Sequence, residues 1–381
     1  MTRRIGIIGG GILGSSIAYH LSLYEGVEPW VIEKNLIGSG TTARSAGTVC
    51  LLDDSLPEEF FGIRVLALQT YKEMERESPG SAGFVQCGTL VACPNAQVLD
   101  FVKKGIELSR KYGFSASFLE STEDIKKRVP DVSTEGLLGA GYTDEDGYVD
   151  ATAISVTYAK KAAARGAKVL TGTKVTEVKK TGNGIRLITN KGDFDFDSVI
   201  NASGPWAHQV DGMVSVELPL FHTKAEVFVL KPRKDVGAHV PIVKYPRFYT
   251  KPEGSRIFAC RAHLTMSASK SEDSGIFDPD ALPLSGGTDQ NFLEFLTNEF
   301  LHNVPSWADS AVTNDYLAYR METVDYLPVV GPSKVPGFVL AVGAGGNGVL
   351  LAPTIGRSIA RLVALGSEDE FLRRFRYTRF A

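Results

Sequence analysis

Three glycines and one acid near the start of the chain form a pattern that could bind a dinucleotide. Gly9, Gly11 and Gly14 have the spacing Gly-x-Gly-x-x-Gly, and Glu33 follows at nearly the distance expected of an acid that binds a ribose. In such a pattern the first glycine permits a tight turn, the second lets the backbone approach a pyrophosphate, and the third lets the next helix pack closely. Glu33 could accept hydrogen bonds from a ribose diol, and its charge would repel a 2′-phosphate. The spacing therefore predicts a dinucleotide site.

The elements needed to position these residues stand in the expected order. Residues 5–8 are apolar and long enough for a buried parallel strand, which ends at the glycines. Apolar residues with helical spacing follow between Ile12 and Leu21. A helix there would direct its N-terminal N–H groups and partial positive charge at the phosphates. A second strand over 30–33 ends at Glu33.

A loop rich in glycine, serine and threonine follows Glu33 and contains one arginine, Arg44. Its backbone and hydroxyl groups could donate hydrogen bonds, and the guanidinium could neutralise phosphate charge. The alternative is an ordinary surface loop with a solvated arginine. The position directly after the ribose acid favours a binding loop.

The bulk composition is that of a folded protein without a nucleic-acid partner. Of 381 residues, 43% are apolar and 22% are charged, and the formal net charge is −3. The four cysteines are scattered, so we expect buried reduced thiols and no metal site. We expect no transmembrane helix, because glycine or charge interrupts the apolar runs before about 18 residues. A core strand begins near residue 1, so we expect no cleavable signal peptide and a cytoplasmic protein.

The middle of the chain departs from the α/β pattern and then returns to it. Helices are predicted over 56–78, 96–112, 151–165 and after Ser121, a strand over 88–92, and a connecting turn over 139–149. The acids of that turn lack the spacing of an EF-hand calcium loop. Strands over 168–170 and 197–202 resume the α/β pattern, so the nucleotide domain should be discontinuous.

Period-two alternation over 216–265 predicts an antiparallel sheet, and the polar residues 266–287 should form a surface excursion. We therefore predict an α/β fold, with a discontinuous Rossmann-type domain and an α+β domain built on an antiparallel sheet. The first domain takes residues 1–85, 145–215 and 318–381, and the second takes residues 86–144 and 216–317.

Another strand, glycine loop and helix lie near the end of the chain. A strand over 338–342 runs into a loop over 343–348, and Pro353 should begin a helix that ends near Leu365. No strand with a ribose acid follows, so a second dinucleotide is not expected. The helix N-terminus could instead stabilise negative charge on another part of the same cofactor.

Four motifs together resemble those of the FAD-dependent amine and amino-acid oxidoreductases of the D-amino-acid oxidase superfamily. They are Gly9-x-Gly11-x-x-Gly14 with Glu33, the loop 38–47, Asn201-Ala-Ser-Gly-Pro-Trp206, and Arg320 with Asp325-x-x-Pro328 and residues 345–353. The resemblance covers nearly the whole chain. Within the superfamily the chain is most similar to glycine oxidase, sarcosine oxidase and its β subunit, and the archaeal proline dehydrogenase β subunit.

The resemblance implies an extended FAD that is bound without a covalent link. Its pyrophosphate would lie over the first glycines, its ribose on Glu33, its adenine on the Val175 backbone, and its pyrimidine oxygen on the N–H groups of 346–349. The implied cofactor-binding residues are Gly9, Gly11, Ile12, Leu13, Gly14, Glu33, Lys34, Thr41, Thr42, Arg44, Ser45, Ala46, Gly47, Val175, Ala202, Gly204, Trp206, Gly346, Asn347, Gly348 and Val349. Ala318 occupies the place where sarcosine oxidases have the cysteine that joins FAD, and the loop 38–47 has no histidine.

The resemblance also implies catalytic residues. Arg320 matches the arginine that grips a substrate carboxylate in members similar to glycine oxidase, and a guanidinium suits a carboxylate geometrically. Tyr249 and His263 are candidate polar helpers from the predicted antiparallel sheet. The alternatives are a structural salt bridge from Arg320 to Asp325 or Glu322, and a His263 that is merely packed or at the surface.

Two departures from the family affect the substrate side. Ala259 and Cys260 stand at the centre of the strand where some sarcosine oxidases keep a lysine that helps oxygen react. That difference leaves room for a dehydrogenase. Gly346 stands where glycine oxidase has an arginine, so the pocket should differ.

The implied reaction is oxidation of the C–N bond of a small amino acid or N-alkyl amino acid, of the glycine, sarcosine, proline or D-amino-acid class. Hydride would pass to flavin N5 and the imine would hydrolyse, with no obligatory protein base. The alternatives are an FAD-dependent 2-hydroxy-acid or glycerol-3-phosphate dehydrogenase, a flavoprotein subunit of a larger complex, and, from the fingerprint alone, an NAD-dependent dehydrogenase. A hydroxyl substrate needs a base, normally histidine, and no histidine lies in a flavin motif. A homo-oligomer or a partner subunit is compatible with these expectations.

Overall fold

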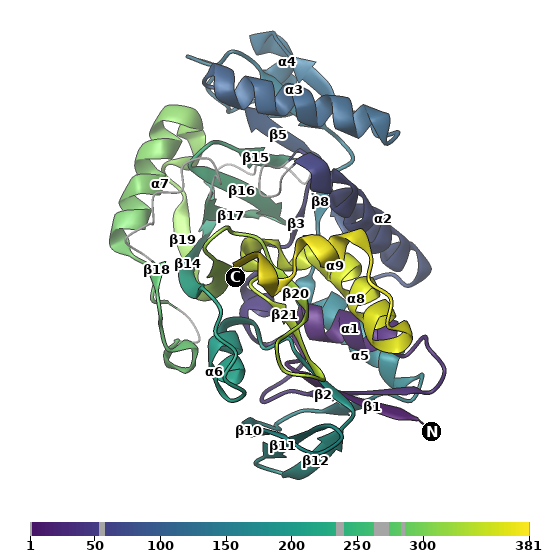
Figure 1. The fold of residues 1–381 in the computed structure, drawn as a ribbon. Helices are drawn as coiled ribbons and strands as arrows, with labels where there is room; N and C mark the ends of the chain where they lie inside the picture. Colours follow the sequence, from purple (N-terminus) through teal and green to yellow (C-terminus); the bar gives the residue numbers. More distant parts are fainter. Residues whose placement is uncertain (1, 53–57, 234–239, 263–273, 283–285, 381) are drawn as a thin grey trace.

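A computed structural model of the chain describes residues 2–52, 58–233, 240–262, 274–282 and 286–380. Two large sheets organise it (Figure 1). The first sheet has the order β20-β21-β13-β1-β2-β9, in which only the β20–β21 pair is antiparallel. Its strands are β1 (Arg3–Ile8), β2 (Val27–Ile32), β9 (Lys168–Leu170), β13 (Ser198–Asn201), β20 (Val329–Pro332) and β21 (Phe338–Val342). Ile7 pairs with Val31 on one side and Ile200 on the other, and all three are fully buried. Such an apolar run suits a strand that is covered on both faces.

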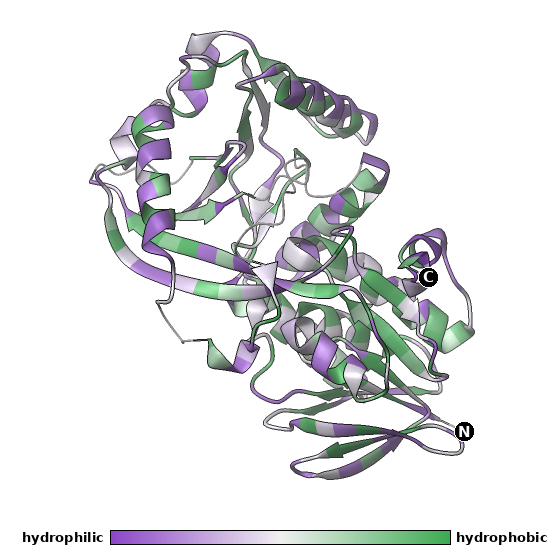
Figure 2. Ribbon diagram, turned by 60° about the vertical axis from the view of Figure 1, so that its left-hand side comes forward, coloured by the Kyte–Doolittle hydropathy of each residue, from purple (hydrophilic) through white to green (hydrophobic). Residues whose placement is uncertain are grey.

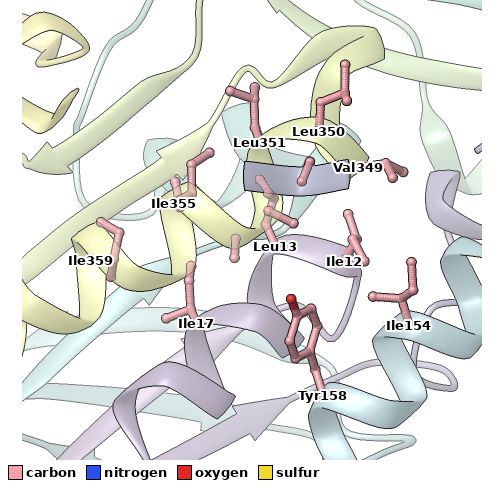
Figure 3. Close-up of a cluster of buried hydrophobic side chains, with 14 of the residues drawn as sticks. Ile12, Leu13, Ile17, Ile154, Tyr158, Val349, Leu350, Leu351, Ile355 and Ile359 are labelled. Carbon is pink, nitrogen blue, oxygen red and sulfur yellow. The ribbon is translucent and has the colours of Figure 1, made fainter. Parts of the chain in front are cut away.

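Four helices supply most of the core beside this sheet. They are α1 (Ile12–Leu21), α2 (Phe61–Glu77), α5 (Ala151–Ala163) and α8 (Gly348–Leu365). Figure 3 shows Ile12, Leu13 and Ile17 of α1 between Ile154 and Tyr158 of α5 and the apolar side chains of α8. Helix α1 is therefore packed on both sides. Burying one such aliphatic side chain contributes about 1.5–3 kcal/mol to the stability of the fold.

Helix α8 corrects two sequence-based expectations. It begins at Gly348 rather than at Pro353, which lies inside it. Proline lacks the N–H that would reach the Val349 carbonyl, and the Tyr71 hydroxyl donates to that carbonyl instead, at 2.6 Å. Residues Gly345–Leu365 are also long and apolar enough to cross a membrane, contrary to our estimate of the apolar runs. Over half of that window is buried inside the fold, as in the core helix of a folded domain.

The second large sheet has the order β18-β14-β17-β16-β15-β5-β7-β6, and β19 pairs with β14. It is antiparallel apart from the β15–β5 pair. Its strands are β5 (Thr89–Ala92), β6 (Ser117–Leu119), β7 (Ala140–Thr143), β14 (Leu220–Lys231), β15 (Ile242–Lys244), β16 (Phe248–Glu253), β17 (Arg256–Arg261), β18 (Ser274–Gly275) and β19 (Ala311–Thr323). One face packs on α7 (Gln290–Asn303), where the ring centroids of Phe228 and Phe292 are 5.6 Å apart. The opposite face carries Val227, Tyr249 and Cys260, because side chains alternate along each strand.

The remaining elements cap or connect the two sheets. Helices α3 (Ala96–Lys111) and α4 (Thr122–Arg128) lie at the β5–β6 end, and α6 (Ala207–Gly212) and α9 (Glu370–Arg374) follow β13 and α8 (Figure 1). One small sheet contains β10 (Val175–Lys180), β11 (Ile185–Thr189) and β12 (Gly192–Phe196), and another contains β3 (Thr48–Val49), β4 (Val85–Gln86) and β8 (Gly147–Tyr148). The predicted connecting turn 139–149 therefore contains β7 and β8, so that prediction was wrong. Short 3₁₀ helices are η1 (Thr41–Arg44), η2 (Glu58–Phe60), η3 (Gly204–Trp206), η5 (Pro279–Ala281), η6 (Pro305–Trp307), η7 (Gly345–Asn347) and η8 (Tyr377–Phe380).

The predicted fold class is confirmed: a mostly parallel sheet flanked by helices is joined to a largely antiparallel sheet with helices on one face. In Figure 2 hydrophobic residues gather on the strands, while hydrophilic residues are frequent on the outlying helices. The proposed domain limits remain a prediction. Strand β19 runs without a break through the limit drawn at residue 318.

Candidate active site

A cavity of about 420 Å³ lies where the carboxyl ends of β1, β2, β13 and β21 face the second sheet. Segments from the whole chain line it, which explains why no single motif could describe it. The predicted site residues in its lining are Gly9, Gly11, Ile12, Leu13, Glu33, Lys34, Thr41, Thr42, Arg44, Ser45, Ala46, Gly47, Val175, Ala202, Gly204, Trp206, Tyr249, Arg320, Gly346, Gly348 and Val349. Gly14 and Asn347 are not part of the lining, and His263 lies outside the described residues.

The glycine turn between β1 and α1 is as tight as its spacing predicts. Gly9 has a φ of 103°, and a Cβ there would lie 2.5 Å from the Ala202 carbonyl oxygen. A Cβ on Gly14 would lie 1.9 Å from the Gly9 carbonyl oxygen, so the first turn of α1 packs directly on the strand end. A Cβ on Gly11 would meet only the Thr42 hydroxyl, at 3.2 Å. The backbone at Gly11 is thus exposed to the cavity, and Gly14 acts through packing.

Glu33 directly follows β2 and is held by backbone donors. Its two carboxylate oxygens accept hydrogen bonds from the N–H groups of Gly10 and Asn35, each at 2.7 Å. These bonds orient the carboxylate beside the glycine turn, where a ribose hydroxyl could still reach its remaining lone pairs.

Lys34 and Trp206 form the wall next to Glu33, and they share a partner that sequence reasoning missed. The Lys34 ammonium lies 3.6 Å from the centre of the Trp206 ring and forms an ion pair with Asp280. The Trp206 indole N–H donates to the same carboxylate at 3.0 Å. The Lys34 hydrogen bond is the chief cause that lowers the pKa of Asp280. Asp280 belongs to the segment interpreted as a surface excursion, which reaches back to the cavity wall.

The threonine-rich loop connects the two sheets across the cavity. In η1 the Thr42 hydroxyl accepts a hydrogen bond from the Ile12 N–H at 3.1 Å, and the Thr41 hydroxyl donates to the Tyr319 carbonyl at 2.7 Å. Gly47 has a φ of 68°, and a Cβ there would lie 2.2 Å from the Val149 carbonyl oxygen. The residues of the loop line the cavity and bond to both of its sides, which favours the predicted binding loop over an ordinary surface loop.

Arg320 lies on β19 opposite Thr223 of β14. A Cβ on Gly346 of the second glycine loop would stand 3.3 Å from Nη1 of Arg320, so the guanidinium packs on η7. The proposed salt bridge to Asp325 is not formed, because Arg379 binds that carboxylate, with Nε 2.7 Å from Oδ2. Within the described residues no hydrogen bond or ion pair of the Arg320 side chain is recorded. A guanidinium in this position has its donors available for a bound anion.

Tyr249 enters the cavity from β16, on the same face of the sheet as Arg320. It pairs across the strands with Cys260, and its hydroxyl interacts with that thiol. Burial raises the pKa of the Cys260 thiol to about 11, so this cysteine stays neutral near pH 7. Ala318 also lines the cavity, and none of the described lining residues is a cysteine or a histidine.

The donor set suits an extended dinucleotide with a polar ring system. The exposed Gly11 backbone and the start of α1 offer N–H groups to a pyrophosphate, and Arg44 adds a cation. The start of α8 offers a second set of backbone donors beside the start of α1, since a Cβ on Gly348 would lie 3.6 Å from Cγ2 of Ile12. No group of three or more potential metal ligands occurs in the part of the chain that the structure describes.

Comparison with known proteins agrees with this donor set. Residues 4–362 match the family model described as DAO, FAD dependent oxidoreductase. Human mitochondrial sarcosine dehydrogenase is 25% identical over 395 residues, which covers all of this chain and 41% of that protein. Glycine oxidase of Geobacillus kaustophilus (strain HTA426) is 27% identical over 377 residues and is covered to 94%. The crystal structure of L-proline dehydrogenase from P. horikoshii superposes with a TM-score of 0.83 over 100% of this chain and 98% of that one, at 24% identity, which shows a shared fold.

The chain spans under half the length of sarcosine dehydrogenase, so that protein's activity as a whole does not transfer. The family model, in contrast, covers the glycine turn, the Arg44 loop, Arg320 and the start of α8. The chain therefore belongs to the DAO family of FAD-dependent oxidoreductases.

Proposed function

We propose that this enzyme oxidises the C–N bond of a small amino acid or N-alkyl amino acid. The observation that carries the proposal is the Arg320 guanidinium, which lies in the cavity wall and forms no ion pair with a described residue. A guanidinium with two parallel donors matches a carboxylate, and a charge-assisted pair of this kind fixes the orientation of the substrate.

The same residues position the rest of the substrate. A carboxylate on Arg320 lies against the sheet face that also carries Tyr249, so the adjacent carbon is directed toward the centre of the cavity. FAD bound along the cavity supplies the hydride acceptor. The Tyr249 hydroxyl adds a polar contact beside the reacting carbon, and the apolar wall formed by Ala225 and Ala318 excludes water.

The charged groups in the lining favour an amine over a hydroxyl substrate. Among the described lining residues, Glu33 is the single carboxylate, and it lies at the glycine-turn end of the cavity. A 2-hydroxy acid needs a base near the reacting carbon, whereas an amine can lose its proton to water before it binds. We therefore retain the amino-acid proposal.

FAD binding is proposed for the predicted cofactor residues in the lining, with the pyrophosphate at Gly11 and the ribose at Glu33. The presence of Ala318, and of no cysteine or histidine among the described lining residues, supports a non-covalent cofactor.

The test is anaerobic reduction of the purified holoenzyme with a panel of compounds. Glycine, sarcosine, proline and D-alanine form one set, and lactate and glycerol 3-phosphate form the other. We expect loss of flavin absorbance with at least one amine. Bleaching by the hydroxyl compounds alone would overturn the proposal, and no bleaching by either set would indicate an accessory flavoprotein subunit.

A further inference from the structure

Glu322 is a buried carboxyl group directly behind the proposed substrate site. It follows Arg320 by two positions on β19, so both side chains lie on the same face of the strand. Only 8% of Glu322 is exposed, and it does not line the cavity. A Cβ on Gly345 would lie 2.0 Å from its Oε2 atom, so the carboxyl group packs against the first residue of η7. Gly345 thus covers Glu322, and the next residue, Gly346, covers Arg320.

The carboxyl group has little to stabilise a negative charge. The Thr223 hydroxyl is 3.4 Å from Oε1, a long hydrogen bond, and Arg320 is the cation that acts on it. Burial raises the pKa of Glu322 to about 7, and the positive charge of Arg320 opposes this rise. A carboxyl group with such a pKa changes its charge near neutral pH. Its buried ionised form is then stabilised only by a nearby cation or hydrogen-bond donor.

Other charged groups on the packed elements do not take that role. Elements η3 and η7 carry no titratable side chain, and η1 contributes Arg44, which lies in the cavity wall. On β14, His222 and Lys224 flank Thr223 and so project from the opposite face. The pKa of His222 is lowered by burial, so this histidine stays neutral through neutral pH.

We propose that Glu322 is a positioning residue whose protonation controls how strongly Arg320 binds a substrate carboxylate. The neutral acid leaves the guanidinium available to the substrate. The ionised form of Glu322 competes with the substrate carboxylate for the same Arg320 guanidinium, which it reaches from behind the cavity. The inference rests on the proposed role of Arg320.

The sign of the pH effect follows from linkage. Binding of an anion at Arg320 favours the protonated form of Glu322, so the complex takes up a proton when it forms above the pKa of this group. Affinity for a carboxylate should be constant below that pKa and should fall above it by at most about tenfold per pH unit.

The test uses acetate as the probe and the FAD-loaded enzyme. Acetate has no amine, and its carboxylate stays ionised between about pH 6 and about pH 8.5, so the ligand itself does not titrate in this range. Its dissociation constant is measured from the change in flavin absorbance. We expect a rise of roughly 30-fold for the wild type between these pH values and a constant value for Glu322→Gln. Glu253→Gln, a half-exposed glutamate on the same sheet, is the matched control and should keep the wild-type slope.

A second measurement needs no variant. Calorimetric titration of the wild type with acetate, in buffers of different ionisation enthalpy, gives the number of protons taken up. We expect nearly one proton per acetate at about pH 8.5 and close to none at about pH 6. Absence of uptake at the higher pH, or a wild-type slope in Glu322→Gln, would overturn the role of Glu322.

A variant of Arg320 distinguishes failure of the proposed substrate site from failure of the proposed role of Glu322. If Arg320→Met binds acetate as tightly as the wild type, the proposed substrate site itself is wrong. If Arg320→Met loses acetate binding while Glu322→Gln keeps the wild-type slope, Arg320 stands and the further inference fails.

Discussion

The two ends of the cavity are built in different ways. The cofactor end, which we define as Gly9–Gly14 with Glu33, is formed by the backbone of the glycine turn and by one carboxylate, all within or directly after one continuous βαβ unit. The substrate face, defined as Tyr249 and Arg320 with the buried Glu322 behind them, is formed by side chains from strands that are far apart in the sequence. Backbone geometry leaves almost no choice of residue at the first end, whereas side-chain identity sets the chemistry at the second.

The largest expected effect is at the cofactor end. In Gly14→Ala the new methyl group would meet the Gly9 carbonyl at 1.9 Å, and α1 would have to move away from β1. We expect a loss of about 1–3 kcal/mol in stability and release of FAD during gel filtration. Gly182→Ala is the control, because nothing lies within 4 Å of a Cβ there. Retention of FAD by Gly14→Ala at wild-type level would contradict a backbone-limited cofactor end.

The second largest effect should be confined to the substrate face and leave the cofactor end unchanged. Arg320→Met should raise the KM of the amino-acid substrate by roughly 10- to 100-fold, since a charge-assisted hydrogen bond contributes about 1.5–3 kcal/mol. The FAD content should stay at the wild-type level, because the variant leaves the glycine turn intact. Steady-state kinetics and the ratio of flavin to protein absorbance measure both quantities. Arg186→Met, at an exposed pair with Asp195 on a different sheet, should change neither.

A third variant tests the element that connects the two ends, which is η7 with the start of α8. Tyr71→Phe removes the hydroxyl that donates to the Val349 carbonyl, and that buried oxygen would lose its partner beside Pro353. An unsatisfied buried acceptor costs about 1–3 kcal/mol, so the thermal transition should shift to lower temperature. Tyr112→Phe, at a half-exposed ring, is the control. Equal transitions for the two variants would show that the hydroxyl is dispensable.

The smallest effect concerns Asp280 at the cofactor wall. Lys34 lowers the pKa of this carboxyl group, so its contribution is present above the ordinary pKa of aspartate and is lost as the pH falls through the lowered value. Because the pair is partly exposed, we expect Asp280→Asn to weaken FAD binding by no more than about 1 kcal/mol at neutral pH. The difference from the wild type should vanish in acid. An FAD titration at both pH values checks this, and a difference that persists in acid would exclude the ion pair as its cause.

Local pattern predicted the cofactor end well. Strand, turn, helix and second strand occur close to where the spacing placed them. Helix α5 begins at Ala151 as predicted, and Asp150 caps it by accepting hydrogen bonds from the N–H groups of Thr152 and Ala153. Predictions failed where a distant residue supplied a missing bond. Pro353 looked like a helix start because the partner of the Val349 carbonyl, Tyr71, is far away in the sequence. The turn 139–149 looked irregular because β7 and β8 pair with strands from other parts of the chain.

The substrate face could be predicted only in part. Arg320 was found through a motif, but two salt bridges remained open for it, and the structure assigns Asp325 to Arg379 instead. The sequence named Glu322 only as a possible salt-bridge partner of Arg320 and gave no signal for Asp280. Their places in the structure depend on burial under Gly345 for Glu322 and on contact with Lys34 for Asp280.

The sequence by itself determined the turn at Gly9–Gly14, the acid at Glu33 and the alternation of the second sheet, since each depends on backbone sterics and short-range periodicity. Tertiary structure alone decided that Arg320 has no ion-pair partner among the described residues, that Glu322 is buried behind it, and that α8 begins at Gly348. The physical reason is that burial, and with it the charge state and availability of a side chain, depends on atoms contributed by distant segments.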